Sequence, residues 1–176
     1  MKSRRITSWR HASPSHPQAG TGAVVIVTGS EGGTWAMPYV LWSEMFEIGV
    51  PDIDAQHRQL LDIINHFHGA LKSGESPNHV FATLNALIRY TQAHFAGEEA
   101  IMEQSSYPAE KVEQHKKIHE QLVTDIFNLQ EQLAGNSKSI VHDIETFLNG
   151  WLIQHILLVD KRLGAYCVPG RGAPAA

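Results

Sequence analysis

Cysteine is almost absent from the sequence, since Cys167 is the only one among 176 residues. An intramolecular disulfide framework is therefore excluded, and the composition suits a reducing compartment. The formal net charge is -4, and Lys and Arg are scattered along the chain. This distribution offers no basic surface to nucleic acid or to an acidic membrane, so we expect no nucleic-acid partner.

Long apolar runs are also missing. No segment approaches the ~20 consecutive apolar residues of a membrane span. The run that follows Arg4 and Arg5, at 23–27, is shorter than the apolar region of ~7 to 15 residues in an export signal. We therefore expect no membrane span and a cytoplasmic location. Residues 1–38 are rich in Gly, Ser, Thr and Pro without a helical or strand period, which predicts a flexible N-terminal extension.

After this extension the sequence changes to four long amphipathic segments. Apolar residues recur every three or four positions from about Ile53 to Lys72, from Pro77 to about Gln104, from Pro108 to Leu133, and from about Ser137 to Leu163. This is the period of one face of an α-helix. Loops of ~3 to 5 residues require neighbouring helices to run antiparallel. The predicted fold is all-α, an up-down-up-down antiparallel four-helix bundle over residues 39–166, followed by a C-terminal tail at 167–176.

Histidine is the residue in excess, with 11 against 14 Lys and Arg together. A single histidine on an apolar face is more often a hydrogen-bonded core residue than a metal ligand. Here, however, six polar residues take positions where the helical period calls for Leu or Ile. An unpartnered polar group in a core costs about 1–3 kcal/mol, so the set indicates a bound metal. The six residues are His57, His94, Glu98, His115, His119 and His155.

Asp160 has a less obvious relation to this set. It follows His155 by five residues, which on a regular α-helix separates the two side chains by roughly 140° around the axis. A local π-type widening of the helix, which is frequent at functional sites, would bring them together. An uninterrupted α-helical hydrogen-bond ladder in this segment would contradict the hypothesis.

Four motifs occur in a fixed order along the chain: Ile-Asp-Ala-Gln-His at 53–57, His-Phe-Ala-Gly-Glu-Glu at 94–99, Tyr-Pro at 107–108 followed by two histidines, and Trp151 followed by His155 and Asp160. Together they resemble the hemerythrins, specifically the bacterial hemerythrins, over about residues 40–166. The resemblance implies an oxo-bridged, non-haem di-iron centre. Its implied ligands are His57, His94, Glu98, His115, His119, His155 and Asp160.

The same resemblance implies how the ligands divide. One iron would be held by His115, His119 and His155, the other by His57 and His94, and Glu98 and Asp160 would bridge both. Dioxygen would bind reversibly at an open position of the second iron, with Trp151 and Leu158 lining the oxygen pocket. The implied role is oxygen storage or delivery by a monomer that is not an enzyme, with an oxygen-consuming protein as candidate recipient.

Two other classes of function remain as alternatives. An oxygen or iron sensor would use the same bundle to signal occupancy, but only a short extension and no output domain accompanies it. A di-iron oxidase or peroxidase, or a dinuclear-metal hydrolase, would use the same cage of ligands. The absence of any Glu-x-x-His pair and of a convincing general base beside the site disfavours these enzymes.

Overall fold

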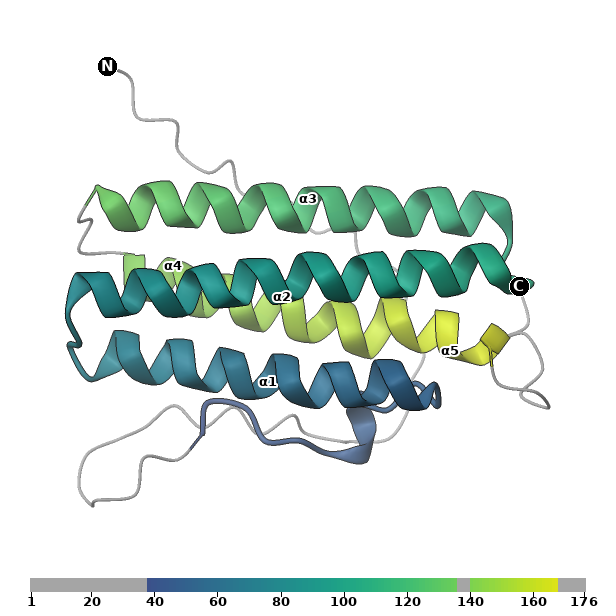
Figure 1. Cartoon of the computed structure of the whole chain (residues 1–176), viewed down its shortest axis with the longest axis horizontal. Helices are drawn as coiled ribbons and strands as arrows, with labels where there is room; N and C mark the ends of the chain where they lie inside the picture. The colour runs from purple at the N-terminus through teal and green to yellow at the C-terminus, as the bar shows by residue number, and fades with distance from the viewer. Residues whose placement is uncertain (1–37, 136–139, 168–176) are drawn as a thin grey trace, which may run out of the picture.

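A computed structural model of the chain describes residues 38–135 and 140–167. Four helical rods lie side by side (Figure 1), and no strand occurs within these ranges. The first three rods are α1 (Pro51–Lys72), α2 (Pro77–Gln104) and α3 (Ala109–Ala134). The predicted all-α antiparallel bundle is confirmed. The flexible extension and most of the tail fall outside the described residues, apart from Pro38 and Cys167, and stay predictions. No described helix is long and apolar enough to cross a membrane.

Local signals account for the turn between the first two rods. Gly74 has φ 69, a left-handed conformation that glycine adopts without steric penalty, and α1 ends just before it. The Ser76 hydroxyl accepts a hydrogen bond from the backbone N–H of His79 at 3.3 Å. This is the N-cap arrangement that precedes a helix opening with proline, here Pro77. Since the turn is short, α1 and α2 pack as antiparallel neighbours.

The fourth rod is not a uniform α-helix. It begins as α4 (Ile140–Phe147), continues through two π-helical segments, η2 (Leu148–Ile153) and η3 (His155–Asp160), and ends as α5 (Lys161–Cys167). In a π-helix each backbone N–H bonds to the carbonyl five residues back, so residues five apart lie on one face. The π-type widening hypothesised for His155 and Asp160 is confirmed.

Apolar faces of the rods meet in one main core. Fully or almost fully buried side chains from every rod contribute, among them Phe67, Leu84, Leu122 and Ile144. Burying one such side chain contributes about 1.5–3 kcal/mol to folding. A smaller apolar cluster of Met102, Tyr107 and Leu163 lies toward the C-terminal end of α2. Along α2, therefore, polar residues 94 and 98 lie between two apolar layers.

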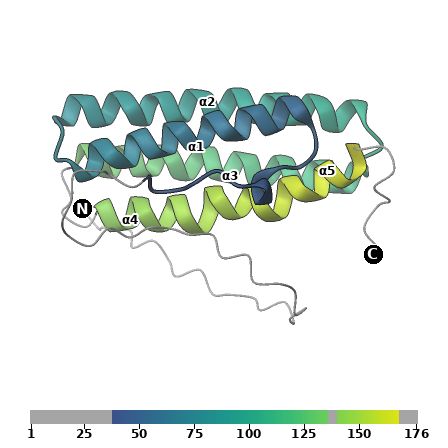
Figure 2. The same cartoon turned by 90° about the horizontal axis from the view of Figure 1, so that it is seen from below.

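The segment before α1 covers the outside of the bundle (Figure 2). Its one helical turn is η1 (Glu44–Phe46). The Asn65 side chain holds this segment to α1, because it accepts from the Val40 N–H and donates to the Val40 carbonyl, both at 2.9 Å. The Asp54 carboxylate accepts from the N–H groups of Ile48 and Gly49. These bonds place the Phe46 carbonyl next to the core of the bundle.

Candidate metal centre

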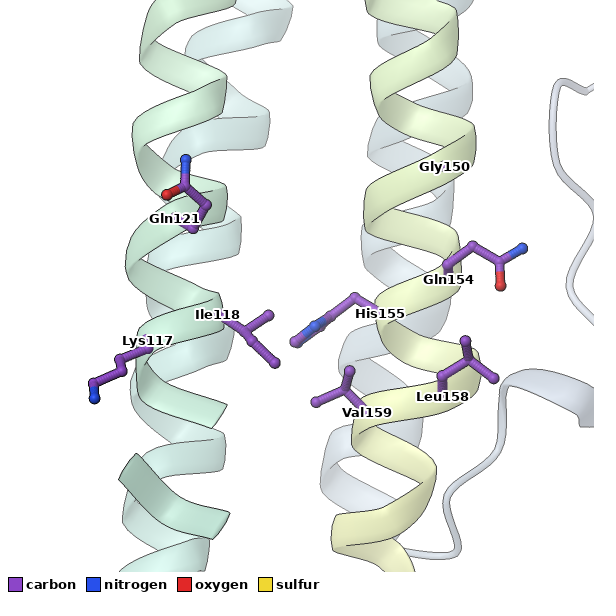
Figure 3. A pocket seen from close by; sticks show the side chains of 8 residues that line it. All are labelled: Lys117, Ile118, Gln121, Gly150, Gln154, His155, Leu158 and Val159. Carbon is purple, nitrogen blue, oxygen red and sulfur yellow. The ribbon is translucent and has the colours of Figure 1, made fainter. Parts of the chain in front are cut away.

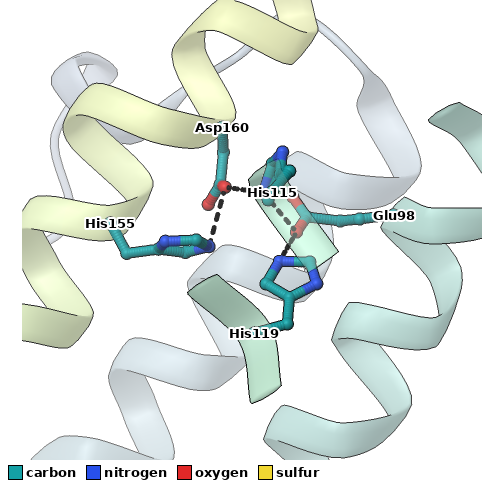
Figure 4. A group of neighbouring side chains, drawn as sticks. All are labelled: Glu98, His115, His119, His155 and Asp160. Atoms are coloured by element: carbon teal, nitrogen blue, oxygen red, sulfur yellow. Dashed lines mark hydrogen bonds and ion pairs between the residues drawn. The ribbon is translucent and has the colours of Figure 1, made fainter. Parts of the chain in front are cut away.

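Seven polar side chains from all four rods converge between the two apolar layers. They form two overlapping groups, in each of which one ligand atom per residue lies within 4.8 Å of all the others. The three-histidine group consists of His115, His119, His155, Glu98 and Asp160, and Figure 4 shows these five side chains pointing toward one another. The two-histidine group consists of His57, His94 and the same two carboxylates. Glu98 and Asp160 thus belong to both.

Burial of this cluster is nearly complete. None of the seven residues is more than 4% exposed, and Glu98, His57 and Asp160 are at 0%. The burial expected for six of them from the helical period is confirmed. Histidines that the period places elsewhere, such as His66 on α1 and His142 on α4, are exposed. The helical pattern therefore separates the cluster histidines from surface ones.

Three of the histidines use their outer ring nitrogen for a hydrogen bond. Nδ1 of His57 lies 3.2 Å from the Phe46 carbonyl oxygen, Nδ1 of His94 lies 3.0 Å from Oε1 of Gln56, and Nδ1 of His119 lies 3.0 Å from Oε1 of Glu99. A carbonyl or carboxylate oxygen only accepts, so each Nδ1 carries the proton. The Nε2 lone pair of each ring is then free and faces the cluster.

Several inward atoms of the cluster have no hydrogen-bond partner. Nε2 of His57, His94 and His119 and both carboxylate oxygens of Glu98 are buried without a hydrogen bond. Buried polar atoms are otherwise nearly always hydrogen-bonded. Imidazole nitrogens and carboxylate oxygens together are the donors that zinc, iron and similar transition metals take in proteins. The cluster therefore fits a bound metal ion, and its two overlapping groups fit a pair of ions.

The two carboxylates differ in their surroundings. Burial raises the pKa of Glu98 well above its ordinary value, and the nearby charge of Asp160 adds to this. Burial also raises the pKa of Asp160, but the neighbouring His155, His115 and His57 outweigh it, so the net pKa lies well below its ordinary value. Asp160 Oδ1 lies 3.1 Å from His155 Nε2 and 3.2 Å from His115 Nε2. Of the two, Asp160 is therefore the stronger acid.

Burial keeps the imidazoles of His94 and His119 neutral. It lowers the pKa of His94 to about 3, with the neighbouring His57 adding to the effect. It lowers the pKa of His119 to about 2, with His115 adding to the effect. A neutral imidazole with Nδ1 protonated is the form that coordinates a metal through Nε2. Both rings are therefore in the coordinating form at neutral pH.

Two polar partners of the cluster were not singled out from the sequence. Gln56 reaches His94 from α1, and Asp54 holds the segment that presents the Phe46 carbonyl to His57. Glu99, the last residue of the motif at 94–99, turns its carboxylate toward His119. The only hint of these contacts in the sequence is that Gln56 is adjacent to His57. Helical spacing cannot show that Gln56 contacts His94, because His94 lies on another helix.

Trp151 and Leu158 are the residues expected to line the oxygen pocket. Leu158 is 55% exposed and lies on the rim of a surface groove of about 380 Å³ between α3 and the fourth rod. In Figure 3, Ile118, His155 and Val159 point into the gap between the two rods, whereas Leu158 points away from it. The assignment of Leu158 to the oxygen pocket stays a prediction. The Trp151 side chain lies outside what the structure describes.

Comparison with known proteins assigns the chain to a family. The family model described as the hemerythrin HHE cation binding domain matches residues 48–167, which include all seven residues of the cluster. The chain belongs to the hemerythrin family. A bacteriohemerythrin of Stenotrophomonas maltophilia is 31% identical over 120 residues, which cover 68% of this chain and 76% of that protein.

Further hemerythrins show the same extent of similarity. A bacteriohemerythrin of Methylococcus capsulatus is 30% identical over 73% of this chain and 96% of its own length. A myohemerythrin of Sipunculus nudus is 32% identical over 70% of this chain and 88% of its own length. A solved structure of a leucine-to-phenylalanine mutant superposes with a TM-score of 0.66 at 29% identity, covering 74% of this chain and 98% of the other. The hemerythrin domain therefore accounts for the bundle and leaves the first residues of the chain unmatched.

Proposed function

We propose that this chain binds dioxygen reversibly at two iron ions held by His57, His94, Glu98, His115, His119, His155 and Asp160, and thereby stores or delivers oxygen. The observation that carries the proposal is the pair of overlapping ligand groups that share two buried carboxylates. Membership in the hemerythrin family supports it independently.

The unequal size of the two groups favours ligand binding at one ion. The three-histidine group offers five residues and the two-histidine group offers four. If both ions took the same number of ligands, the one held by the two-histidine group would have one more position for an external molecule. When bound, a pair of ferrous ions supplies the two electrons that dioxygen takes up on binding and returns on release.

Apolar side chains around the cluster suit reversible binding. The Phe95 ring stacks on the His119 ring with their centroids 3.7 Å apart and an angle of 4° between the planes, and it meets His155 edge-on at 5.6 Å. Ile156, next to His155, is fully buried. Such walls exclude water and protons, which would otherwise promote irreversible oxidation of the iron.

The donor set argues for oxygen carriage over oxidation of a substrate. Five neutral imidazoles and two carboxylates form a less anionic cage than the Glu-rich and Glu-x-x-His sites of di-iron bundles that contain four glutamates. Fewer anionic donors stabilise high iron valences less, so cleavage of the O–O bond is disfavoured. Within the cluster, as far as the structure describes it, every buried side chain that could act as a general base is itself one of the proposed ligands.

The deciding experiment is a spectroscopic oxygen cycle. Protein reconstituted with ferrous iron under argon is exposed to air, and its visible spectrum is recorded through repeated returns to argon. We expect two irons per chain and an absorption band that appears in air and disappears under argon in every cycle. Irreversible bleaching, or steady consumption of a reductant with release of peroxide, would refute carriage and favour an oxidase or peroxidase. A chain that takes up no iron would refute the proposed centre itself.

A further inference from the structure

The groups that accept hydrogen bonds from the cluster histidines differ in charge between the two halves of the centre. In the three-histidine group, His119 Nδ1 lies 3.0 Å from a carboxylate oxygen of Glu99. In the two-histidine group, His94 Nδ1 faces the amide oxygen of Gln56 at 3.0 Å, and His57 Nδ1 faces the backbone carbonyl of Phe46 at 3.2 Å. The acceptor at His119 is therefore anionic, whereas the acceptors at His94 and His57 are neutral.

This difference changes how strongly each imidazole donates to a metal. A hydrogen bond to a carboxylate is stronger than one to an amide, and it draws the Nδ1 proton away from the ring. The ring then becomes a more basic ligand through Nε2, as in the carboxylate–histidine–metal arrangements of other proteins. A more basic ligand stabilises the higher-valent form of the metal that it holds.

We propose that Glu99 and Gln56 make the two metal positions electronically unequal, with Glu99 favouring the higher valence in the three-histidine half and Gln56 favouring the lower valence in the two-histidine half. The proposal rests on the di-iron centre proposed above. It assigns both residues a positioning and tuning role exerted through His119 and His94, without direct contact with dioxygen.

The two acceptors differ in their surroundings. Gln56 lies beside Gly97 of α2, where even an added Cβ would make only an ordinary van der Waals contact with the Gln56 amide oxygen, at 3.6 Å. The backbone carbonyl of Gln56 also accepts a hydrogen bond from the Tyr90 hydroxyl at 3.2 Å. The Glu99 side chain is 32% exposed, so water screens part of its charge. The direct hydrogen bond to His119 is therefore the main route of its effect.

The test exchanges the two acceptors without changing their size. Glu99→Gln removes the charge and keeps an oxygen that can accept from His119, whereas Gln56→Glu adds a charge behind His94. Redox titration of the iron-loaded protein, with Mössbauer spectra of the half-oxidised form, reports which ion holds the ferric state. We expect E99Q to shift the ferric-to-ferrous equilibrium of the three-histidine ion toward ferrous on the order of tenfold, or ~59 mV for one electron.

The exchange at Gln56 should act in the opposite direction on the other ion. We expect Q56E to shift the two-histidine ion toward ferric by a similar factor, and the double variant to reverse the order of the two potentials. Glu103→Gln is the matched control, because Glu103 lies one turn beyond Glu99 on α2 and pairs with Lys116 instead of a histidine. Its potentials should equal those of the unchanged protein. A general loosening of the structure would not produce shifts of opposite sign.

Cobalt(II) affinity provides a second measurement that needs no redox chemistry. Titrations followed by the visible cobalt bands should show weaker binding in the three-histidine half of E99Q and tighter binding in the two-histidine half of Q56E. Unchanged potentials and unchanged cobalt affinities in both variants, or shifts of the same sign, would overturn the proposal. If the unchanged protein itself bound no pair of metal ions, the proposed function would fail first, which is a separate outcome.

Discussion

His155 and Asp160 are five residues apart in the chain, and yet His155 Nε2 lies 3.1 Å from Asp160 Oδ1. The π-helical segment η3, which runs from one of these residues to the other, is the physical cause. An α-helix would turn Asp160 away from the cluster by roughly 140°. The widened turn thus delivers the carboxylate that both ligand groups share.

The register of this carboxylate is testable by moving it one position. In the double variant Val159→Asp with Asp160→Val, the carboxylate stands four residues after His155, where a regular α-helix would accept it. Because the helix is widened, we expect the new carboxylate to face the groove and the iron content to fall well below two per chain. Val159→Asp alone is the control and should keep its iron, since Val159 lines the groove. Full iron binding by the double variant would contradict the register.

The two ligand groups predict selective metal loss. His57→Ala removes a donor from the two-histidine group only, and His119→Ala removes one from the three-histidine group only. We expect each variant to lose iron first from its own half, with affinity there reduced on the order of 10- to 100-fold, as measured by iron analysis and Mössbauer spectra. His66→Ala, on the exposed face of α1, is the control. If both variants kept two irons and bound oxygen normally, the ligand assignment would be refuted.

The stability of the metal-free protein should decrease below pH 6.5. His94 and His119 have folded-state pKa values of about 3 and about 2 against an ordinary value of 6.5, so the unfolded chain binds more protons than the folded one as the pH drops through 6.5. Glu98, whose pKa burial raises, takes up a proton in the folded state and offsets part of this loss. We expect a net loss of about 2 kcal/mol between pH 7 and pH 5.

Urea unfolding in the presence of a chelator at the two pH values measures this loss. His94→Gln should reduce it, because glutamine does not titrate. A free energy of unfolding that stays constant between pH 7 and pH 5 would show that the two imidazoles are not held neutral in the folded state.

Alanine substitutions at two glycines of the fourth rod should change the stability of the protein in opposite directions. A Cβ on Gly164 would collide with the backbone carbonyl of Ile48, whereas one on Gly150 would meet nothing within 4 Å. We expect Gly164→Ala to destabilise the protein by about 1–3 kcal/mol through overpacking and Gly150→Ala to stabilise it by roughly 0.5–1 kcal/mol through helix propensity. Thermal unfolding of the metal-free variants measures both. Shifts of the same sign would refute the close approach of α5 to the segment before α1.

The sequence by itself determined the bundle and most of the cluster. Helical periodicity is a local property, since residues three and four apart share a face in any α-helix. Polar residues such as His57 and His119 on otherwise apolar faces had to meet in the core, whichever way the helices were tilted. The four segments, their antiparallel order and six of the seven converging side chains follow from this periodicity.

Only the tertiary structure decided the remaining details. Whether the fourth rod widens between His155 and Asp160 depends on packing against the other rods, because one sequence can form either an α-turn or a π-turn. The exposure of Leu158 on the rim of the groove between α3 and the fourth rod is likewise visible only in the folded chain. The direction of Glu99 depends on α3 bringing His119 within hydrogen-bonding distance. These are choices between local alternatives of similar energy, and contacts between helices far apart in the chain select among them.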